Sequence, residues 1–413
     1  MPKVLQINVT SNWGSTGKIA ESCNCYARAN GWETYFAYGR YCNLSDSSII
    51  AGPSNKMDVC AHYAENILFD NEGLASRRAT RQLLKKIEKL QPDIIHLHNI
   101  HDHWLNYKIL FEYLNQTNIK VVWTFHDFWA ITGHCSHFVQ VSCDKFTTEC
   151  DDCPFTKGKL LPIVKQCNRN FKLKKLLFTA NKHLTIVPVS EWVGDNVRKS
   201  FLKNNSIRVI PNGVDTSVFK VTKFDDLAII SNQLQTFKKK IEGKFVIMAV
   251  SSQWKSTDKG LDDYIAMAKV LKDDEVIVLV GVSEKLSSNL PINIIGINRT
   301  NNQQELAALY TCADVICSFS LAETFGLTII EGYACGTPAV VYDNTAPPSL
   351  ITPDTGFVVP NKDIKAAYQA IQIIRIKGKS AYTNACICLV SEKYNKNDCF
   401  NKYVELYESL IND

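Results

Sequence analysis

The sequence predicts an α/β protein built from two doubly wound domains. Its 413 residues are too many for one ordinary domain and suit two domains of roughly 200 residues each. Short apolar runs alternate with longer amphipathic stretches along the chain, which is typical of parallel sheets covered on both faces by helices. The alternation occurs once in each half, so we expect two separate parallel sheets.

The first half contains four strand candidates, each a short apolar run. They are Val4–Val9, Asp93–Leu97, Lys120–Phe125 and Leu184–Val189. Apolar residues recur at helical spacing over Arg77–Leu90, and Pro92 ends this helix. The second half repeats the plan with strand candidates Lys244–Val250, Glu275–Val280, Ile292–Ile297, Asp314–Ser318 and Pro338–Tyr342. The helices predicted between them are Gly260–Leu271, Asn302–Cys312 and Thr324–Ala334.

The domain boundary is inferred from composition. The polar segment Phe201–Ser206 is the best linker candidate. We therefore expect a first domain over residues 1–203 and a second over residues 204–394. The remaining residues, 395–413, form a predicted C-terminal helix that packs back on the first domain.

The composition is that of a globular protein whose charge does not by itself suggest nucleic-acid binding. Lysine and arginine number 46 against 41 acidic residues, a mild excess. The N-terminus leads directly into a strand, and no stretch approaches the ~18 apolar residues needed to span a bilayer. We therefore expect a cytoplasmic protein. Its 15 cysteines are then buried apolar residues or metal ligands and not a disulfide framework.

The turn after the strand Asp314–Ser318 carries the strongest motif, because ligands of open α/β sheets bind beyond the carboxyl ends of the strands. Glu323 and Glu331 lie eight positions apart in this stretch. A helix starting near Thr324 would point the free N–H groups of its first turn at a diphosphate. Two carboxylates on either side would suit two sets of hydroxyls. The alternative is a helix-terminal charge and a solvated surface residue.

The complete string carries a family resemblance. The run from Glu323 to Glu331, with Phe325-Gly326-Leu327 inside it and Ala334-Cys-Gly-Thr-Pro338 after it, resembles the retaining glycosyltransferases of family four. Further matches follow in the family's order, namely Pro211-Asn-Gly-Val-Asp215 with Phe219, Lys259-Gly260 and the run Asn301–Tyr310. The resemblance covers nearly the whole chain. It implies the GT-B fold, in which two Rossmann-like domains face each other across a cleft that holds the active site.

The resemblance also implies roles for the donor-binding residues. Glu331 would accept hydrogen bonds from ribose hydroxyls, and Glu323 would bind the donor sugar together with the three backbone amides of the Phe-Gly-Leu run. Lys259 would neutralise the leaving diphosphate, and no cofactor or catalytic metal is expected. Relatives usually carry an arginine several residues before that lysine. This chain has Trp254 and Lys255 there, so Lys255 is either the second cation or a solvated surface lysine.

The first half should supply the acceptor side. Gly14 and Gly17 follow the first strand, but Asn12 and Ile19 stand where a P-loop requires glycine and serine or threonine. The family has a glycine-rich loop at the cleft in this place, and a plain strand-to-helix turn is the alternative. His126 follows the strand Lys120–Phe125 directly, and the resemblance implies that it contacts the donor sugar without acting as a general base.

Two clusters could bind a metal. The first contains a Cys-x2-Cys pair and would be either a structural zinc site or a set of reduced thiols. His134 or His137 could replace one of its sulfurs. Its cysteines are Cys135, Cys143, Cys150 and Cys153. The second is the group His96, His98, His101 and His103, which lacks partner carboxylates at ligand spacing, so we do not expect a metal there. We expect His96 and His98 to be packing or supporting residues.

The segment from residue 157 to residue 182 is strongly basic. No acidic residue occurs between Pro154 and Ser190. The basic residues are Lys157, Lys159, Lys165, Arg169, Lys172, Lys174, Lys175 and Lys182. Interleaved with leucine and phenylalanine, they suit either an anionic membrane surface or a solvated helix face. Peripheral attachment at the inner face of a membrane would fit a lipid-linked glycan acceptor.

We therefore expect a retaining glycosyltransferase that moves a hexose-type sugar from a UDP- or GDP-sugar to a glycan or lipid-linked glycan, in surface polysaccharide synthesis. The alternatives are a sugar-nucleotide epimerase or a phosphorylase of the same fold, or a non-catalytic subunit that binds a sugar nucleotide. A dinucleotide-dependent oxidoreductase is excluded because the chain lacks the Gly-x-Gly-x-x-Gly turn with its ribose-binding acid.

Overall fold

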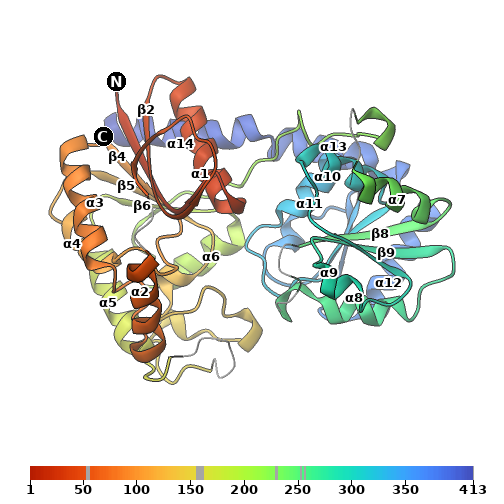
Figure 1. Cartoon of the computed structure of the whole chain (residues 1–413), viewed down its shortest axis with the longest axis horizontal. Coiled ribbons are helices and arrows are strands. Elements are labelled where there is room, and N and C mark those ends of the chain that lie inside the picture. Colours follow the sequence, from red (N-terminus) through yellow and green to blue (C-terminus); the bar gives the residue numbers. More distant parts are fainter. Residues whose placement is uncertain (53–55, 155–161, 228–230, 252–253, 255–256, 413) are drawn as a thin grey trace. The chain divides into compact units, whose positions relative to one another are not determined.

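The computed structural model describes residues 1–52, 56–154, 162–227, 231–251, 254 and 257–412 (Figure 1). The chain forms two compact units, and each is built around one sheet. The first unit comprises Met1–Pro211 and Phe400–Asp413, and the second comprises Asn212–Cys399. The two parallel sheets that the sequence predicted are confirmed.

The first sheet has seven strands in the order β3-β2-β1-β4-β5-β6-β7, and all neighbours pair in parallel. The strands are β1 Lys3–Ser11, β2 Glu33–Cys42, β3 Ser48–Ala51, β4 Ile94–Leu97, β5 Lys120–Phe125, β6 Leu184–Pro188 and β7 Ser206–Ile207. Four of them, β1, β4, β5 and β6, were predicted. The pairing of β7 with β6 places Ser206–Ile207 in the first sheet, just beyond the expected boundary at residue 203.

Helices connect most of these parallel strands, because a parallel pair needs a crossover connection. They are α1 Gly14–Ala29, α2 Lys56–Phe69, α3 Arg77–Leu90, α4 Tyr107–Leu114, α5 Cys167–Thr179 and α6 Glu191–Lys199. The last helix, α14 Lys396–Asn412, belongs to the first unit from Phe400 onward. There the Phe400 ring stacks on Tyr26 of α1 at 5.7 Å between centroids, and Tyr407 is fully buried.

The second sheet has six parallel strands in the order β10-β9-β8-β11-β12-β13. The strands are β8 Phe245–Val250, β9 Glu275–Val280, β10 Ile294–Ile297, β11 Val315–Ser318, β12 Ala339–Tyr342 and β13 Gly356–Val359. The helices are α7 Asn232–Ile241, α8 Leu261–Ala268, α9 Glu284–Ser287, α10 Gln303–Cys312, α11 Leu327–Ala334, α12 Ile364–Lys377 and α13 Ser380–Lys393. Of these strands, β13 was not predicted.

The strand orders locate the places where each sheet can bind a ligand. In the first sheet the order reverses between β1 and β4, and in the second between β8 and β11. Ligands of open α/β sheets bind beyond the carboxyl ends of the strands at such a switch point. The loops that follow these strands are therefore the first places to look for a site.

Candidate active site

The switch point of the second sheet brings together a lysine and a glutamate. Lys259 ends the short 3-10 helix Thr257–Lys259 after β8, and Glu323 lies in the turn after β11. The Lys259 Nζ is 3.0 Å from the Glu323 Oε2 and 3.4 Å from the Ser320 Oγ. Both charged side chains are partly open, with 26% and 29% of their surface exposed. A cation and a carboxylate, both accessible, thus share this edge of the sheet.

Gly260 allows the two loops to approach each other. Its φ of +69° lies in the left-handed region, and a Cβ at this position would collide with the Phe319 carbonyl oxygen. The Leu321 N–H donates to the Asp258 carbonyl over 2.7 Å and links the loops on the other side of the lysine. The backbone therefore fixes where Lys259 can reach.

Helix α11 begins at Leu327, so the predicted start at Thr324 is three residues early. Gly326 caps the helix with a φ of +109°, a left-handed conformation that a helical residue cannot have. Of the three predicted donors, the amides of Phe325 and Gly326 thus belong to the turn, and the amide of Leu327 opens the helix. The Phe325 side chain is buried.

Glu331 lies on α11 and is held by a residue of α10. The Tyr310 hydroxyl donates to the Glu331 Oε2 over 2.9 Å. Tyr310 is fully buried, and both burial and the carboxylate raise the pKa of its hydroxyl well above the ordinary value, so it remains a donor. The Thr337 hydroxyl donates to the Tyr310 carbonyl over 2.6 Å. The sequence placed Tyr310 in a family match but gave no indication of this contact.

Lys255, the proposed second cation, lies outside the described residues.

In the first unit, His126 follows β5 and stacks on His98. The two rings are 5.3 Å apart at 15°, and the His98 Nδ1 lies 3.0 Å from the His126 Nε2. Burial lowers the pKa of His126 to about 4, and it lowers the pKa of His98 well below the ordinary value. Both imidazoles are therefore neutral near pH 7.

A hydrogen-bonded chain extends from His126 to the C-terminal helix. The His98 Nε2 lies 2.7 Å from the Gln6 Oε1, and the Gln6 Nε2 donates to the Tyr407 hydroxyl over 3.2 Å. His96 lies beside this chain, with its Nδ1 at 2.5 Å from the same hydroxyl and its Nε2 at 2.7 Å from the Thr124 hydroxyl. His96 and His98 thus support His126, as expected. A glutamine within the apolar run of β1 was the sequence signal that could have revealed this chain.

His101 differs from its neighbours because it has carboxylate partners, which the sequence had not suggested. Its Nε2 lies 2.8 Å from the Asp127 Oδ2, and its Nδ1 lies 3.9 Å from the Glu72 Oε1. Burial alone would lower the pKa of His101, but the Asp127 carboxylate outweighs it and raises the pKa to about 9. Despite burial, the His101 cation lowers the pKa of Asp127 to about 2. An ion pair therefore lies next to the neutral His126.

The segment for which the sequence left a glycine-rich loop or a plain strand-to-helix turn open is a short turn between β1 and α1. Gly14 and Gly17 lie in the first turn of α1, so the connection from β1 is a tight turn. A Cβ on Gly17 would stand 2.6 Å from the Thr10 Oγ1, so the glycine allows this close approach.

Trp13 in this turn and Tyr41 of β2 form an aromatic pair that the sequence did not indicate. The rings of Trp13 and Tyr41 are 4.8 Å apart and are 40% and 55% exposed.

The basic segment is only partly available to an external surface. Lys157 and Lys159 lie outside the described residues. Lys174 is buried, donates to the Trp129 carbonyl over 2.6 Å and lies 3.5 Å from the Trp129 ring centroid, so its expected exposure is wrong. Lys172 pairs with Glu149 at 2.6 Å. Exposed residues of the segment include Lys165, Lys175, Leu176 and Lys182. No described helix combines the length and the hydropathy required to cross a membrane.

The predicted cysteine set does not form one ligand group. Within the described part of the chain, Cys135, Cys143 and Cys150 belong to no group of three converging ligand atoms. Cys153 does, but with His134 and Cys167. Sequence spacing missed Cys167 because it opens α5, which is a different element.

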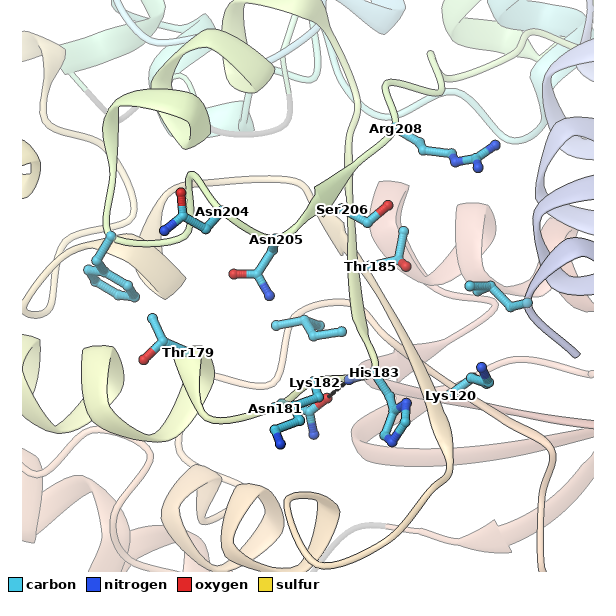
Figure 2. Close-up of a pocket in the computed structure, with 13 residues that line it drawn as sticks. Lys120, Thr179, Asn181, Lys182, His183, Thr185, Asn204, Asn205, Ser206 and Arg208 are labelled. Carbon is cyan, nitrogen blue, oxygen red and sulfur yellow. Dashed lines mark hydrogen bonds between the residues drawn. The ribbon is translucent and has the colours of Figure 1, made fainter. Parts of the chain in front are cut away.

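A pocket lies at the edge of the first sheet where the strands begin, opposite the edge that carries His126 (Figure 2). It has a volume of about 490 Å³ and is lined by the amino ends of β5, β6 and β7. Lys120, Lys182 and Arg208 line it, and none of the lining residues is acidic. Because His126 lies at the carboxyl end of β5, this pocket is separate from the candidate active site.

Both units match families of known proteins. Residues 25–218 match the family model described as Glycosyltransferase Family 4, and residues 231–381 match the one described as Glycosyl transferases group 1. A putative colanic acid biosynthesis glycosyl transferase, WcaC of Escherichia coli, is 21% identical over 98% of this chain and 100% of its own length. A GDP-mannose-dependent phosphatidylinositol dimannoside mannosyltransferase of Mycobacterium tuberculosis is 30% identical, over 29% of this chain and 32% of its own length.

Solved structures show the same fold. Sucrose-phosphate synthase from Thermosynechococcus elongatus matches with a TM-score of 0.69 and 17% identity over 99% of both chains. The Anabaena protein HepE in complex with UDP and glucose matches with a TM-score of 0.65 and 15% identity over 99% of this chain and 100% of its own.

Proposed function

This chain belongs to glycosyltransferase family 4 and is a glycosyltransferase of the GT-B fold, and on that premise we propose that it is a retaining hexosyltransferase that uses a UDP- or GDP-sugar. The proposal depends chiefly on one observation. Lys259 and Glu323 follow the two strands that flank the switch point of the second sheet, and their side chains are 3.0 Å apart. Glu331 lies on α11, the helix that follows Glu323.

The second unit provides a group for each part of a nucleotide-sugar donor. Glu331, oriented by Tyr310, binds the ribose hydroxyls. The amides at the start of α11 and the Lys259 ammonium bind the diphosphate, and Glu323 binds the donor sugar. A fixed cation next to the diphosphate stabilises charge that grows as the sugar departs. One of the relatives named above is GDP-mannose-dependent and one of the solved structures holds UDP and glucose, which supports a nucleotide donor without choosing its base.

The reaction that we propose takes place on one face of the sugar. The bond between C1 and the diphosphate oxygen breaks, and a bond from C1 to the acceptor oxygen forms. The acceptor proton passes to a phosphate oxygen of the leaving group. Lys259 compensates the negative charge of that group, and His126, neutral near pH 7, contacts a sugar hydroxyl.

The acceptor that we propose is a glycan or a lipid-linked glycan of surface polysaccharide synthesis. The match to the colanic acid enzyme over the whole chain supports this class. Trp13 and Tyr41 form an exposed aromatic pair next to the carboxyl ends of β1 and β2, and such a surface suits the apolar face of a pyranose ring. For a lipid-linked acceptor the enzyme would work in the cytoplasm at the inner membrane face, with Lys175 and Leu176 of α5 exposed.

A donor screen followed by a release assay tests the proposal. Thermal shifts with UDP-, GDP- and ADP-sugars identify the donor, and free nucleoside diphosphate is then measured with and without a glycan acceptor. We expect release that requires the acceptor, with an α-linked product from an α-linked donor. Release without transfer, epimerised donor or formation of a sugar phosphate would indicate one of the alternative activities. No stabilisation by any nucleotide sugar would contradict the proposal.

A further inference from the structure

The segment between β5 and α5 has little regular structure of its own. Among the described residues it contains three short 3-10 helices, Trp129–Ile131, Val139–Val141 and Lys145–Thr147. Its apolar contacts include a row of three rings, Phe128, Phe138 and Phe146. A metal bound within such a segment would add a link between parts of it that no regular secondary structure joins.

Three potential metal ligands from distant positions meet in this segment. His134, Cys153 and Cys167 each place one ligand atom within 4.8 Å of the other two. The Cys167 Sγ is 3.3 Å from the His134 Nδ1, and the Cys153 Sγ is 3.8 Å from the His134 Nε2. In a tetrahedral zinc site with Zn–S near 2.3 Å and Zn–N near 2.0 Å, nitrogen and sulfur stand about 3.5 Å apart. The separation between the Cys153 Sγ and the His134 Nε2 is close to this value, whereas the Cys167 Sγ lies beside the other ring nitrogen.

A buried carboxylate supports the histidine. The His134 Nδ1 lies 3.3 Å from the Asp70 Oδ2, which is 1% exposed. The same oxygen accepts a hydrogen bond from the Gln166 backbone N–H over 2.8 Å. A carboxylate on one ring nitrogen fixes the tautomer and directs the other nitrogen at a metal, as at many zinc sites. Here the other nitrogen, Nε2, faces Cys153.

A second group of histidines and a cysteine in the first unit has no ring nitrogen directed at a possible metal. Cys23, His96 and His98 also converge and are fully buried. Both ring nitrogens of His96 and both of His98 already bond to protein side chains that are not metal ligands or to another imidazole. No lone pair is left to aim at a metal there. The comparison singles out the group around His134.

We propose that His134, Cys153 and Cys167 bind a structural zinc ion, with Asp70 supporting the histidine. We assign the fourth position to Cys150, the partner of Cys153 in the Cys-x2-Cys pair, whose sulfur lies outside the converging group and would have to move toward it. The cysteines bind as thiolates, so metal binding releases their protons. This set replaces two of the four cysteines that the sequence suggested, Cys135 and Cys143.

The position of this site indicates what the metal would stabilise. Cys167 opens α5, whose Lys174 donates to the Trp129 carbonyl over 2.6 Å. The Trp129 N–H in turn donates to the Asp127 Oδ1 over 2.9 Å, next to His126. The metal would therefore join the start of α5 to the loop that carries the candidate active-site histidine. Its role is structural, and it lies outside the reaction.

Metal analysis of the full-length chain tests the site. After expression with zinc and extensive dialysis, we expect about one zinc per chain, falling at least fivefold in the Cys167→Ser, Cys153→Ser and His134→Ala variants. Cys143→Ser and Cys60→Ser are the matched controls and should keep the metal. Retention by Cys167→Ser, or loss by Cys143→Ser, would overturn the ligand assignment, and retention by Cys150→Ser would overturn the fourth ligand.

A measurement on the unaltered chain covers the case in which a variant does not fold. Cobalt exchanged for zinc should give the intense visible absorption of a tetrahedral site and a sulfur-to-cobalt charge-transfer band. Mass mapping after alkylation should show Cys153 and Cys167 protected until a chelator is added, while Cys60 reacts throughout. Absence of zinc from the wild-type chain, or equal alkylation with and without chelator, would contradict the site.

Discussion

The Nζ of Lys259 lies 3.0 Å from the Oε2 of Glu323, although 64 positions separate the two residues. The contact arises because the strands that precede them, β8 and β11, are neighbours at the switch point of the second sheet. Both side chains are partly exposed, and such ion pairs contribute little to stability. We therefore interpret the pair as part of the donor site and not as a structural contact.

Replacement of the lysine tests this interpretation. Lys259→Ala removes the cation that compensates the departing diphosphate, so we expect kcat to fall by about 10²- to 10³-fold. The Tm should change by less than about 2 °C, because an exposed ion pair contributes at most about 1 kcal/mol. Lys365→Ala, on the exposed face of α12, is the control and should leave turnover unchanged. Near-normal turnover of Lys259→Ala would refute the role of this lysine.

The hydroxyl of Tyr310 provides a second prediction. Tyr310→Phe keeps the buried ring but removes one hydrogen-bond donor to Glu331, so the carboxylate is held less firmly. We expect nucleotide affinity to weaken roughly tenfold, which corresponds to about 1.4 kcal/mol, by calorimetry with the nucleoside diphosphate. Tyr382→Phe is the matched control, since that buried hydroxyl has no hydrogen-bond partner within the described structure. Equal affinity of both variants would show that Tyr310 does not position Glu331.

Continuous apolar strands were the most predictable part of the fold. The run Lys120–Phe125 reads as one strand from its residues alone, and it forms β5. In contrast, β2 carries Glu33 and Arg40 and alternates buried with partly exposed positions, so it shows no such run. The local pattern also placed α11 too early, because it does not show that Gly326 adopts a left-handed conformation.

The candidate site was predictable where a motif is local and unpredictable where the tertiary fold assembles it. Glu323 and Glu331 belong to one string of residues, and the family resemblance pointed to them. The bond between Tyr310 and Glu331 joins two helices. The chain from His98 through Gln6 to Tyr407 joins β1 to a helix near the C-terminus. Such pairings follow from the order of strands and helices in space, which spacing along the sequence does not give.

The ion pair of His101 and Asp127 predicts a dependence of stability on pH. The folded-state pKa of His101 is raised to about 9, above the unfolded value near 6.5, so folding favours the protonated form. The stabilisation is therefore complete below about pH 6.5 and is lost as the pH rises through 9. We expect His101→Asn to lower the Tm by several degrees at pH 6 and by much less at pH 9.5. A deficit that is the same at both pH values would indicate loss of packing and not of charge.

Trp13 provides the test of the acceptor side. Its ring is 40% exposed and lies 4.8 Å from the ring of Tyr41, so the two present an apolar surface at the end of β1. If a sugar ring packs there, Trp13→Ala removes about 1–1.5 kcal/mol of contact, and the KM for the acceptor should rise roughly tenfold. The KM for the donor should change little, because its main binding groups, Lys259, Glu323 and Glu331, belong to the second unit. Phe69→Ala is the control, since this aromatic residue is 48% exposed at the end of α2. An increase in the donor KM alone would assign Trp13 to the donor, and unchanged kinetics would leave the acceptor surface elsewhere on the first unit.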